Sequence, residues 1–429
     1  GGGYMERVPE GVRRVDGNDS AADESGGEEE PLAPHRVDDC REKFFCQKVL
    51  HQASAPPAQF GPDAINEEIW RSLELMADNF KSRNGDGQDR FRANRFRKAS
   101  QTVKNLAAEV TRHNWREKLL SLRQKPPAGQ GSVWDAIESW VLTGHWTRLE
   151  GQQDDPTLAA VNALMEVWGI GPTTARELVA AGAASVADLV GRESYQGVRL
   201  SEEVKKGVRY FSDMKLKIPR DEVGRIRDLV CGLAQQEFGP NVIVEAVGSY
   251  RRGKPQSHDV DLLITQREGS SPDSHGLVPK LLQRLRDSGI EVVDLKHPQS
   301  ETVSGTEVYL GLLRPPPGVG DSSVMRRFDI RAYPIRNYPY ALLHMTGSDQ
   351  FNRSMRLFAK KKGIKLSDNG MRARISDDRR QQNEMPNMTE AKCERDIFDF
   401  LKLDYVPPHL RHAGQWNVDE GKGIHYAAG

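Results

Sequence analysis

The stretch Gly248-Ser249-Tyr250-Arg251-Arg252-Gly253, followed by His258-Asp259-Val260-Asp261-Leu262-Leu263-Ile264, decides the fold of this 429-residue chain. Successive side chains of a strand point to opposite faces, so Asp259 and Asp261 share one face and the apolar residues beside them share the other. Two carboxylates this close suit hard Mg²⁺ ions, which take oxygen ligands and share them with substrate phosphates. The pattern therefore predicts a strand with a metal site on its polar face.

The residues before this strand are suited to phosphate oxygens. Gly248 lets the backbone approach a triphosphate closely, Ser249 offers a hydroxyl and an amide, and Arg252 offers a charge-assisted fork. A third carboxylate appears downstream in Arg327-Phe328-Asp329-Ile330-Arg331, where Phe328 and Ile330 predict a buried face and Asp329 the opposite one. Two ions about 3.5–4 Å apart, held by such a set, stabilise both the attacking and the leaving oxygen of a displacement.

Together, the Gly-Ser-Tyr-Arg-Arg-Gly and Asp-Val-Asp motifs resemble the nucleotidyltransferase palm of the family X DNA polymerases. The resemblance implies that Asp259 and Asp261 bind both metals. It implies that Asp329 binds the catalytic metal and favours loss of the 3′-hydroxyl proton. A shorter version of the motif also occurs in antibiotic nucleotidyltransferases and RNA tailing enzymes, so the motif alone leaves those classes open.

A second segment, Met345–Arg356, resembles the nucleotide-binding segment of the same family. The resemblance implies that the Gly347 backbone packs against the sugar, and that Arg353 and Arg356 lie near the templating base and the template strand. Family members place Tyr-Phe or Gly-Trp before the Thr-Gly-Ser of this segment, whereas this chain has His344-Met345. The residues that the resemblance assigns to the nucleotide are Gly248, Ser249, Arg252, Arg220, His344, Met345, Gly347, Asp349 and Asn352.

Gly169-Ile170-Gly171, followed by an expected helix from Thr173 to Ala181, is typical of a helix–hairpin–helix. Such a turn brings backbone amides and a helix N-terminus against a DNA phosphate, which is a contact independent of sequence. In similar modules a monovalent cation bridges a carbonyl and the phosphate. The residues expected to contact DNA are Gly169, Gly171, Thr173, Arg331, Arg353 and Arg356.

The turn Gly129-Gln130-Gly131-Ser132 occupies the corresponding place in the amino-terminal helical unit. Family members carry a lysine shortly after this turn, which attacks the sugar of a 5′-deoxyribose phosphate as a Schiff-base nucleophile. Here no lysine occurs between Lys125 and Lys205. We therefore expect 5′-deoxyribose phosphate lyase activity to be weak or absent.

Short runs rich in β-branched and aromatic residues alternate with helical runs after Pro219, which predicts an α+β unit. The expected strands are Val242–Ala246, Val260–Thr265, Glu291–Asp294, Glu307–Gly311 and Phe328–Tyr333, with helices at Asp221–Phe238 and Gly276–Ser288. The fold class is thus α+β: a nucleotidyltransferase palm with helical, helix–hairpin–helix amino-terminal domains and a small α+β carboxy-terminal subdomain. The expected domains are a largely disordered acidic arm (1–60), a helical lyase-like domain (61–150), a helix–hairpin–helix fingers-like domain (151–218), the palm (219–338), a nucleotide-binding thumb-like subdomain (339–412) and a flexible tail (413–429).

Amino-acid composition and charge distribution indicate which kind of partner the chain binds. Lys+Arg and Asp+Glu are both 61, but the first thirty residues carry an acidic run, and residues 81–125 and 353–374 are rich in Lys and Arg, which favours a nucleic-acid partner. Four cysteines with no CxxC pair predict reduced thiols, and no apolar run reaches the roughly 20 residues that span a membrane. Composition leaves cytosol and nucleus open. The resemblance implies a monomer in the nucleus that binds gapped or primer-template DNA and dNTP, uses two Mg²⁺ ions (Mn²⁺ as the alternative), and has other repair proteins as further candidate partners.

The leading hypothesis is a template-directed DNA polymerase that fills short gaps in repair, by base excision or end joining. The alternatives are a template-independent terminal nucleotidyltransferase, an RNA tailing enzyme, and a non-catalytic scaffold that binds DNA ends. The helix–hairpin–helix disfavours RNA tailing, and the modest length of the Pro315–Asp321 loop disfavours terminal transfer. Three carboxylates kept together without a metal would be electrostatically costly, which disfavours the scaffold.

Overall fold

The computed structural model describes residues 44–52, 61–82, 87–104, 106, 108–123, 133–143, 156–267, 276–301, 305–373 and 390–411. Its mixed architecture confirms the α+β fold class. The Gly129–Ser132 turn and the expected tail at 413–429 lie outside the described residues. Among the described residues, no helix is both long and apolar enough to cross a membrane.

A five-stranded sheet forms the centre of the palm and has the strand order β4-β6-β9-β8-β7. Only β6 and β9 pair in parallel; the other neighbours are antiparallel. The strands are β4 (Val242–Ala246), β6 (Val260–Gln266), β7 (Val292–Glu301), β8 (Thr306–Leu313) and β9 (Arg326–Ala332). All five therefore lie where the sequence predicted strands, although β7 runs further than expected.

Different elements pack against the two faces of this sheet. Val260, Leu262 and Ile264 of β6 enter one core with helices α12 (Arg220–Phe238) and α14 (Leu277–Asp287). The alternate residue Leu263 packs on the other face against Ala341 of α15 (Tyr338–Thr346). Because side chains alternate along a strand, Asp261 lies on this second face, opposite the two long helices. Short elements complete the palm: β3 (Ile218–Pro219), α13 (Gly248–Arg251), β5 (Gln256–Ser257) and η4 (Ile335–Asn337).

The carboxy-terminal subdomain follows α15. Its helix α16 (Asp349–Lys361) begins at Ser348, whose side chain accepts a hydrogen bond from the Phe351 amide, as expected of an N-cap. The remaining elements are the hairpin β10 (Ile364–Ser367) and β11 (Gly370–Ala373), α18 (Glu394–Leu401) and η5 (Pro408–Leu410). The sequence left residues 44–50 within an acidic arm, but α2 (Phe45–Gln52) packs into the core of this subdomain, since its apolar residues need a partner.

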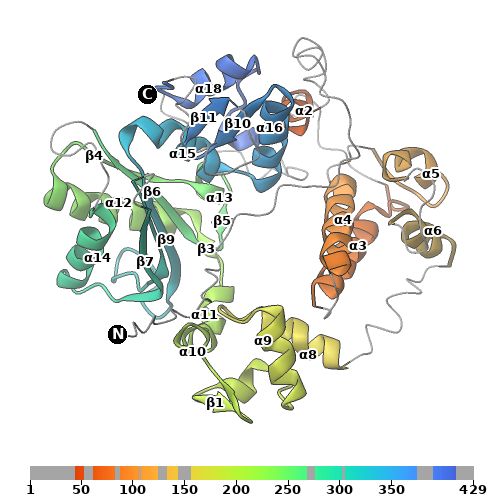
Figure 1. Cartoon of the computed structure of the whole chain (residues 1–429), viewed down its shortest axis with the longest axis horizontal. Coiled ribbons are helices and arrows are strands. Elements are labelled where there is room, and N and C mark those ends of the chain that lie inside the picture. The colour runs from red at the N-terminus through yellow and green to blue at the C-terminus, as the bar shows by residue number, and fades with distance from the viewer. Residues whose placement is uncertain are drawn as a thin grey trace, which may run out of the picture.

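Two helical units precede the palm in the chain and are coloured orange and yellow-green in Figure 1. The first has one apolar core around Phe96, Trp115 and Trp140. It contains α3 (Asn66–Ser82), α4 (Gly87–Lys104), α5 (Trp115–Lys118), η2 (Leu120–Leu122) and α6 (Val133–Thr143). The second contains α8 (Pro156–Met165), α9 (Pro172–Ala180), η3 (Val186–Leu189), β1 (Ser194–Tyr195), β2 (Val198–Arg199), α10 (Glu202–Arg209) and α11 (Phe211–Lys215).

Candidate active site

The three aspartates that the sequence singled out come together. Asp261 of β6 lies directly opposite Asp329 of β9 in the parallel pairing, and Asp259 immediately precedes β6. One ligand oxygen from each of the three carboxylates lies within 4.8 Å of the other two. Phe328 and Ile330 are fully buried in the core on the other face, as the alternation predicted. One strand pairing thus brings together residues that are 68 positions apart in the sequence.

The electrostatics of this cluster suit a divalent cation. Burial, with the charges of Asp259 and Asp329 added to it, raises the pKa of Asp261 to about 8. Burial likewise raises the pKa of Asp329, although Arg327 opposes the shift. Burial and mutual repulsion disfavour the ionised form of these carboxylates, and a cation bound between them would favour it. Hard oxygen donors in this number fit an ion such as Mg²⁺ or Mn²⁺.

Arg327 holds Asp329 in a way that the sequence did not reveal. Its Nε and Nη2 donate to the two carboxylate oxygens at 3.2 and 3.0 Å. The same guanidinium lies 4.2 Å from the centroid of the Trp168 ring, next to the Gly169 turn. Arg327 therefore connects Trp168, at the turn before α9, with a carboxylate of the cluster. The sequence placed Arg327 beside Asp329 but gave no signal for Trp168.

Gly248 is required by its neighbour Asp261. It has φ +55°, a region that favours glycine, and a Cβ at this position would lie 2.1 Å from Asp261 Oδ2. The sequence attributed this glycine to the approach of a triphosphate. The structure adds that the aspartate itself fills the space a side chain would need.

The other phosphate candidates surround the same short helix, α13. Ser249 Oγ donates to Ser257 Oγ at 2.7 Å. Arg252 Nη1 donates to the Thr346 carbonyl at 2.6 Å, so it bridges from the palm to the end of α15. Arg220, at the start of α12, donates to the Tyr250 carbonyl and lies 4.1 Å over that ring. The structure thus brings the predicted set to one side of the aspartates' strand.

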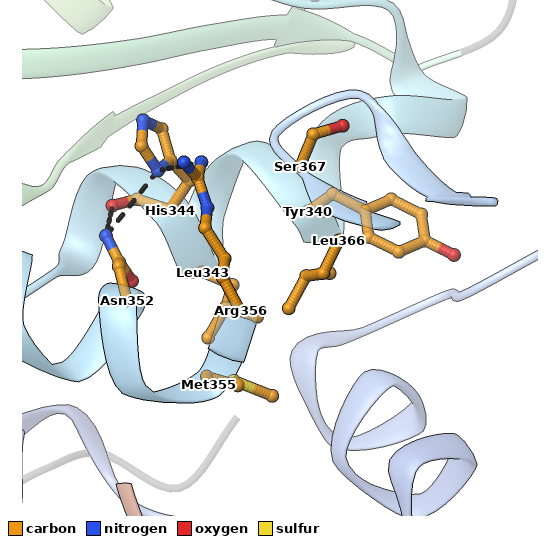
Figure 2. A pocket seen from close by; sticks show the side chains of 8 residues that line it. All are labelled: Tyr340, Leu343, His344, Asn352, Met355, Arg356, Leu366 and Ser367. Carbon is orange, nitrogen blue, oxygen red and sulfur yellow. Dashed lines mark hydrogen bonds between the residues drawn. The ribbon is translucent and has the colours of Figure 1, made fainter. Parts of the chain in front are cut away.

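A small pocket, shown in Figure 2, is lined in part by His344 and Asn352, two of the residues expected to bind the nucleotide. Asn352 Nδ2 donates to the His344 carbonyl at 2.7 Å, and Arg356 Nη2 lies 3.0 Å from His344 Nδ1. Burial lowers the pKa of His344 to about 4, so the ring is neutral near pH 7 and Nδ1 accepts from the arginine. The apolar side of the pocket is lined by Tyr340, Leu343, Met355 and Leu366, with Ser367 beside them.

The other residues that the sequence assigned to the nucleotide and the template make the following contacts. Asp349 forms an exposed ion pair with Arg353 along α16, at 2.8 Å. Met345, near the end of α15, packs against the apolar cluster that contains Val247 and Leu263. Gly347, the C-cap of α15, has φ +68°, and a Cβ there would approach Arg252 Nη1 to 3.0 Å.

A buried ion network ties the palm to the last helix. Glu394 accepts from Arg251 at 2.7 Å and from Arg411 at 2.7 Å, and Arg411 is fully buried. Burial alone would raise the pKa of Glu394, but the two guanidiniums outweigh it and lower that pKa. Arg251 also donates to Thr346 Oγ1 at 2.7 Å. These contacts join residues far apart in the sequence, and no local pattern indicated them.

The expected helix–hairpin–helix turn lies between α8 and α9, with Gly171 as the N-cap of α9. Gly169 has φ +86°, and a Cβ there would come within 3.0 Å of the Val204 amide on α10. A Cβ added at Gly171 would meet nothing within 4 Å, and Thr173 is exposed in the first turn of α9. The part of the turn that was expected to contact a phosphate is therefore accessible from solvent. Arg331, from β9, lies by the Tyr333 hydroxyl, which itself donates to Asp368 at 2.6 Å.

Comparison with known proteins agrees with this geometry. Models of the DNA polymerase beta palm and the DNA polymerase beta thumb match residues 217–335 and 341–412. A model of the fingers domain of DNA polymerase lambda matches residues 162–215. The chain belongs to the family X DNA polymerases.

Individual relatives show the same family. DNA polymerase lambda of Arabidopsis thaliana is 31% identical over 82% of this chain and 63% of its own length, and that of Rattus norvegicus is 31% identical over 83% and 58%. DNA-directed DNA/RNA polymerase mu of Homo sapiens is 28% identical over 81% of this chain and 69% of its own length. This family X chain thus spans about three fifths of the length of the lambda relatives.

Proposed function

We propose that this family X chain is a template-directed DNA polymerase that adds dNMP to a primer 3′-hydroxyl. The observation that carries the proposal is the convergence of Asp259, Asp261 and Asp329 beside a glycine turn that leaves no room for a side chain. The 3′-oxygen attacks the α-phosphorus, the bond to the bridging oxygen breaks, and pyrophosphate leaves. The matches to polymerase palm, thumb and fingers models support this reaction over other nucleotidyl transfers.

Two Mg²⁺ ions, with Mn²⁺ as the alternative, are the proposed cofactors. Asp259 and Asp261 would hold both ions, and Asp329 would hold the one nearer the primer. When bound, such ions neutralise developing charge on the phosphoryl oxygens and lower the pKa of the attacking hydroxyl. Asp329 must then share its carboxylate between the ion and Arg327, which donates to both of its oxygens in the structure.

The chain's own residues bind and orient the nucleotide in this proposal. Arg252, Ser249 and Arg220 supply donors for the triphosphate around α13, as the charges and hydroxyl there allow. His344 crowds the 2′ position of the sugar while Asn352 fixes the His344 carbonyl. Gly347 and Met345 complete the wall against the sugar, and Asp349 lies at the start of α16.

DNA is the proposed macromolecular partner. The exposed turn at Gly169, Gly171 and Thr173 would bind a backbone phosphate, with a monovalent cation between carbonyl and phosphate. Arg331, Arg353 and Arg356 would follow the template strand. We further infer a monomeric, nuclear protein that fills short gaps in base excision repair or end joining, with other repair proteins as partners, and with little 5′-deoxyribose phosphate lyase activity.

One primer-extension assay tests the function. It compares a gapped duplex, a primed template and a single-stranded primer, each with Mg²⁺ and with EDTA. The proposal predicts template-matched extension that is strongest on the gapped duplex and is lost with EDTA. Extension of the single-stranded primer at an equal rate would instead identify a terminal transferase. Binding to the gapped duplex without extension would identify a scaffold.

A further inference from the structure

Helix α2 comes from the amino-terminal part of the chain but packs in the carboxy-terminal subdomain. Figure 1 shows it beside α16, whereas α3, the next described helix along the chain, belongs to the amino-terminal helical unit. Cys46 and Val49 of α2 are buried in the same core as Phe351 and Phe358 of α16. A segment from the start of the chain therefore completes the apolar core of the carboxy-terminal subdomain.

Specific polar contacts fix how α2 sits there. The Gln47 side chain is 2% exposed; its Nε2 donates to the Asp404 carbonyl at 3.0 Å and its Oε1 accepts from the Asp404 amide at 2.9 Å. The Cys46 amide donates to Ser354 Oγ at 3.1 Å. Amides in the first turn of a helix have no partner within the helix, so Ser354 satisfies one of them from another element. These contacts define one register of α2 on α16.

The two faces of α16 have different partners. Ser354 and Phe358 face α2, and the Phe358 ring meets Phe44 edge-on at 5.0 Å between ring centroids. Asn352 and Arg356 face His344 and the pocket of Figure 2. Residues spaced three or four apart share a helix face, which separates these two sets. Helix α2 thus supports α16 from behind the proposed nucleotide side.

We propose that α2 is a positioning helix that stays bound to the back of α16 and sets where α16 presents Asn352 to the nucleotide and Arg356 to the template strand. The effect on the nucleotide rests on the proposed function, whereas the binding of α2 does not. Gln47 and Ser354 are positioning residues in this sense, because they act on α16 and not on the substrate. Release of α2 is expected to loosen α16 and weaken nucleotide binding while leaving the aspartate cluster in place.

The thiol of Cys46 reports the binding of α2 directly. It is fully buried, and burial raises its pKa to about 11, so it reacts with a disulfide reagent only when α2 leaves its site. The test protein keeps Cys46 and carries Cys40→Ser, Cys231→Ser and Cys393→Ser. The matched control protein keeps only Cys393, which is exposed.

We expect the Cys46 protein to react at least about tenfold more slowly than the Cys393 protein. Adding Gln47→Ala should raise the Cys46 rate by about tenfold, because it removes two hydrogen bonds to Asp404, and should leave the Cys393 rate unchanged. Equal rates for Cys46 and Cys393 at the start, or no response of Cys46 to Gln47→Ala, would overturn the proposal. These rates need no polymerase activity, so they stand even if the proposed function fails.

Steady-state kinetics on gapped DNA test the positioning role. Gln47→Ala, in the chain with its native cysteines, should raise KM for dNTP by about fivefold or more while kcat stays within about twofold. Ser354→Ala should act in the same direction. A fall in kcat alone, or no change in KM when Cys46 is shown to be released, would contradict the role of α2 in positioning α16.

Discussion

Replacing Gly248 with alanine should separate the geometry of the metal site from the stability of the fold. The added Cβ would lie 2.1 Å from Asp261 Oδ2, whereas real Cβ contacts are at least 3.0 Å, so the carboxylate must move by about 1 Å. A displacement of that size in a reacting geometry costs on the order of a hundredfold in rate, or about 2.7 kcal/mol of activation free energy. The φ of +55° adds a folding cost of about 1–2 kcal/mol for a residue with a Cβ.

Gly289 provides the matched control. It also has a positive φ, +77°, but a Cβ there would meet nothing within 4 Å. Gly289→Ala should therefore lose similar folding stability in urea and keep its kcat. Single-turnover dNTP incorporation on gapped DNA, together with urea unfolding, measures both quantities. The reasoning is refuted if Gly248→Ala incorporates dNTP within about threefold of Gly289→Ala.

Three further predictions concern the sugar, acid stability and lyase chemistry. His344→Tyr with Met345→Phe should raise the dNTP-over-rNTP ratio of kcat/KM by about tenfold, or roughly 1.4 kcal/mol, and an unchanged ratio would leave these side chains without a role in sugar selection. Glu394→Gln should lower the free energy of unfolding by about 3 kcal/mol at pH 7, because it leaves the buried Arg411 and the partly buried Arg251 without their carboxylate. Because the folded-state pKa of Glu394 lies below the ordinary value of 4.5, ionised Glu394 stabilises the fold fully above pH 4.5 and loses this effect as the pH falls through the folded-state pKa. The urea midpoint of the variant should therefore change less between pH 5 and pH 3 than that of the unmodified chain. Borohydride should trap little covalent adduct with 5′-deoxyribose phosphate DNA, and efficient trapping would show that a lysine such as Lys118 reaches the sugar.

The sequence was most informative where local pattern and chemistry coincide. The alternation around Val260 and Phe328 predicted which faces of β6 and β9 are buried, and the bounds of α12 and β4 follow from equally local signals. The clustering of Asp261 with Asp329 was expected from chemistry and resemblance. The parallel pairing that produces it joins strands distant in sequence, and local periodicity does not specify such pairings.

Contacts between polar residues far apart in the sequence cannot be predicted from local pattern, for a physical reason. Whether Glu394 is an exposed helix residue or the centre of a buried ion network depends on which guanidiniums the fold brings to it. The same holds for Arg327, which could face solvent, DNA or Asp329. Helix α2 is short, and its few apolar residues specify no partner, since any open apolar surface could receive them.

The most direct test of the central claim is Asp329→Ala. Asp329 serves the chemistry and not the DNA backbone, so the variant should lose at least about a hundredfold in dNTP incorporation while its Kd for gapped DNA stays within about threefold. Asp321→Ala, which changes an exposed aspartate in the loop before β9, is the control and should behave like the unmodified chain. Incorporation by Asp329→Ala near the unmodified rate would contradict the assignment of the three aspartates to a metal-dependent polymerase site.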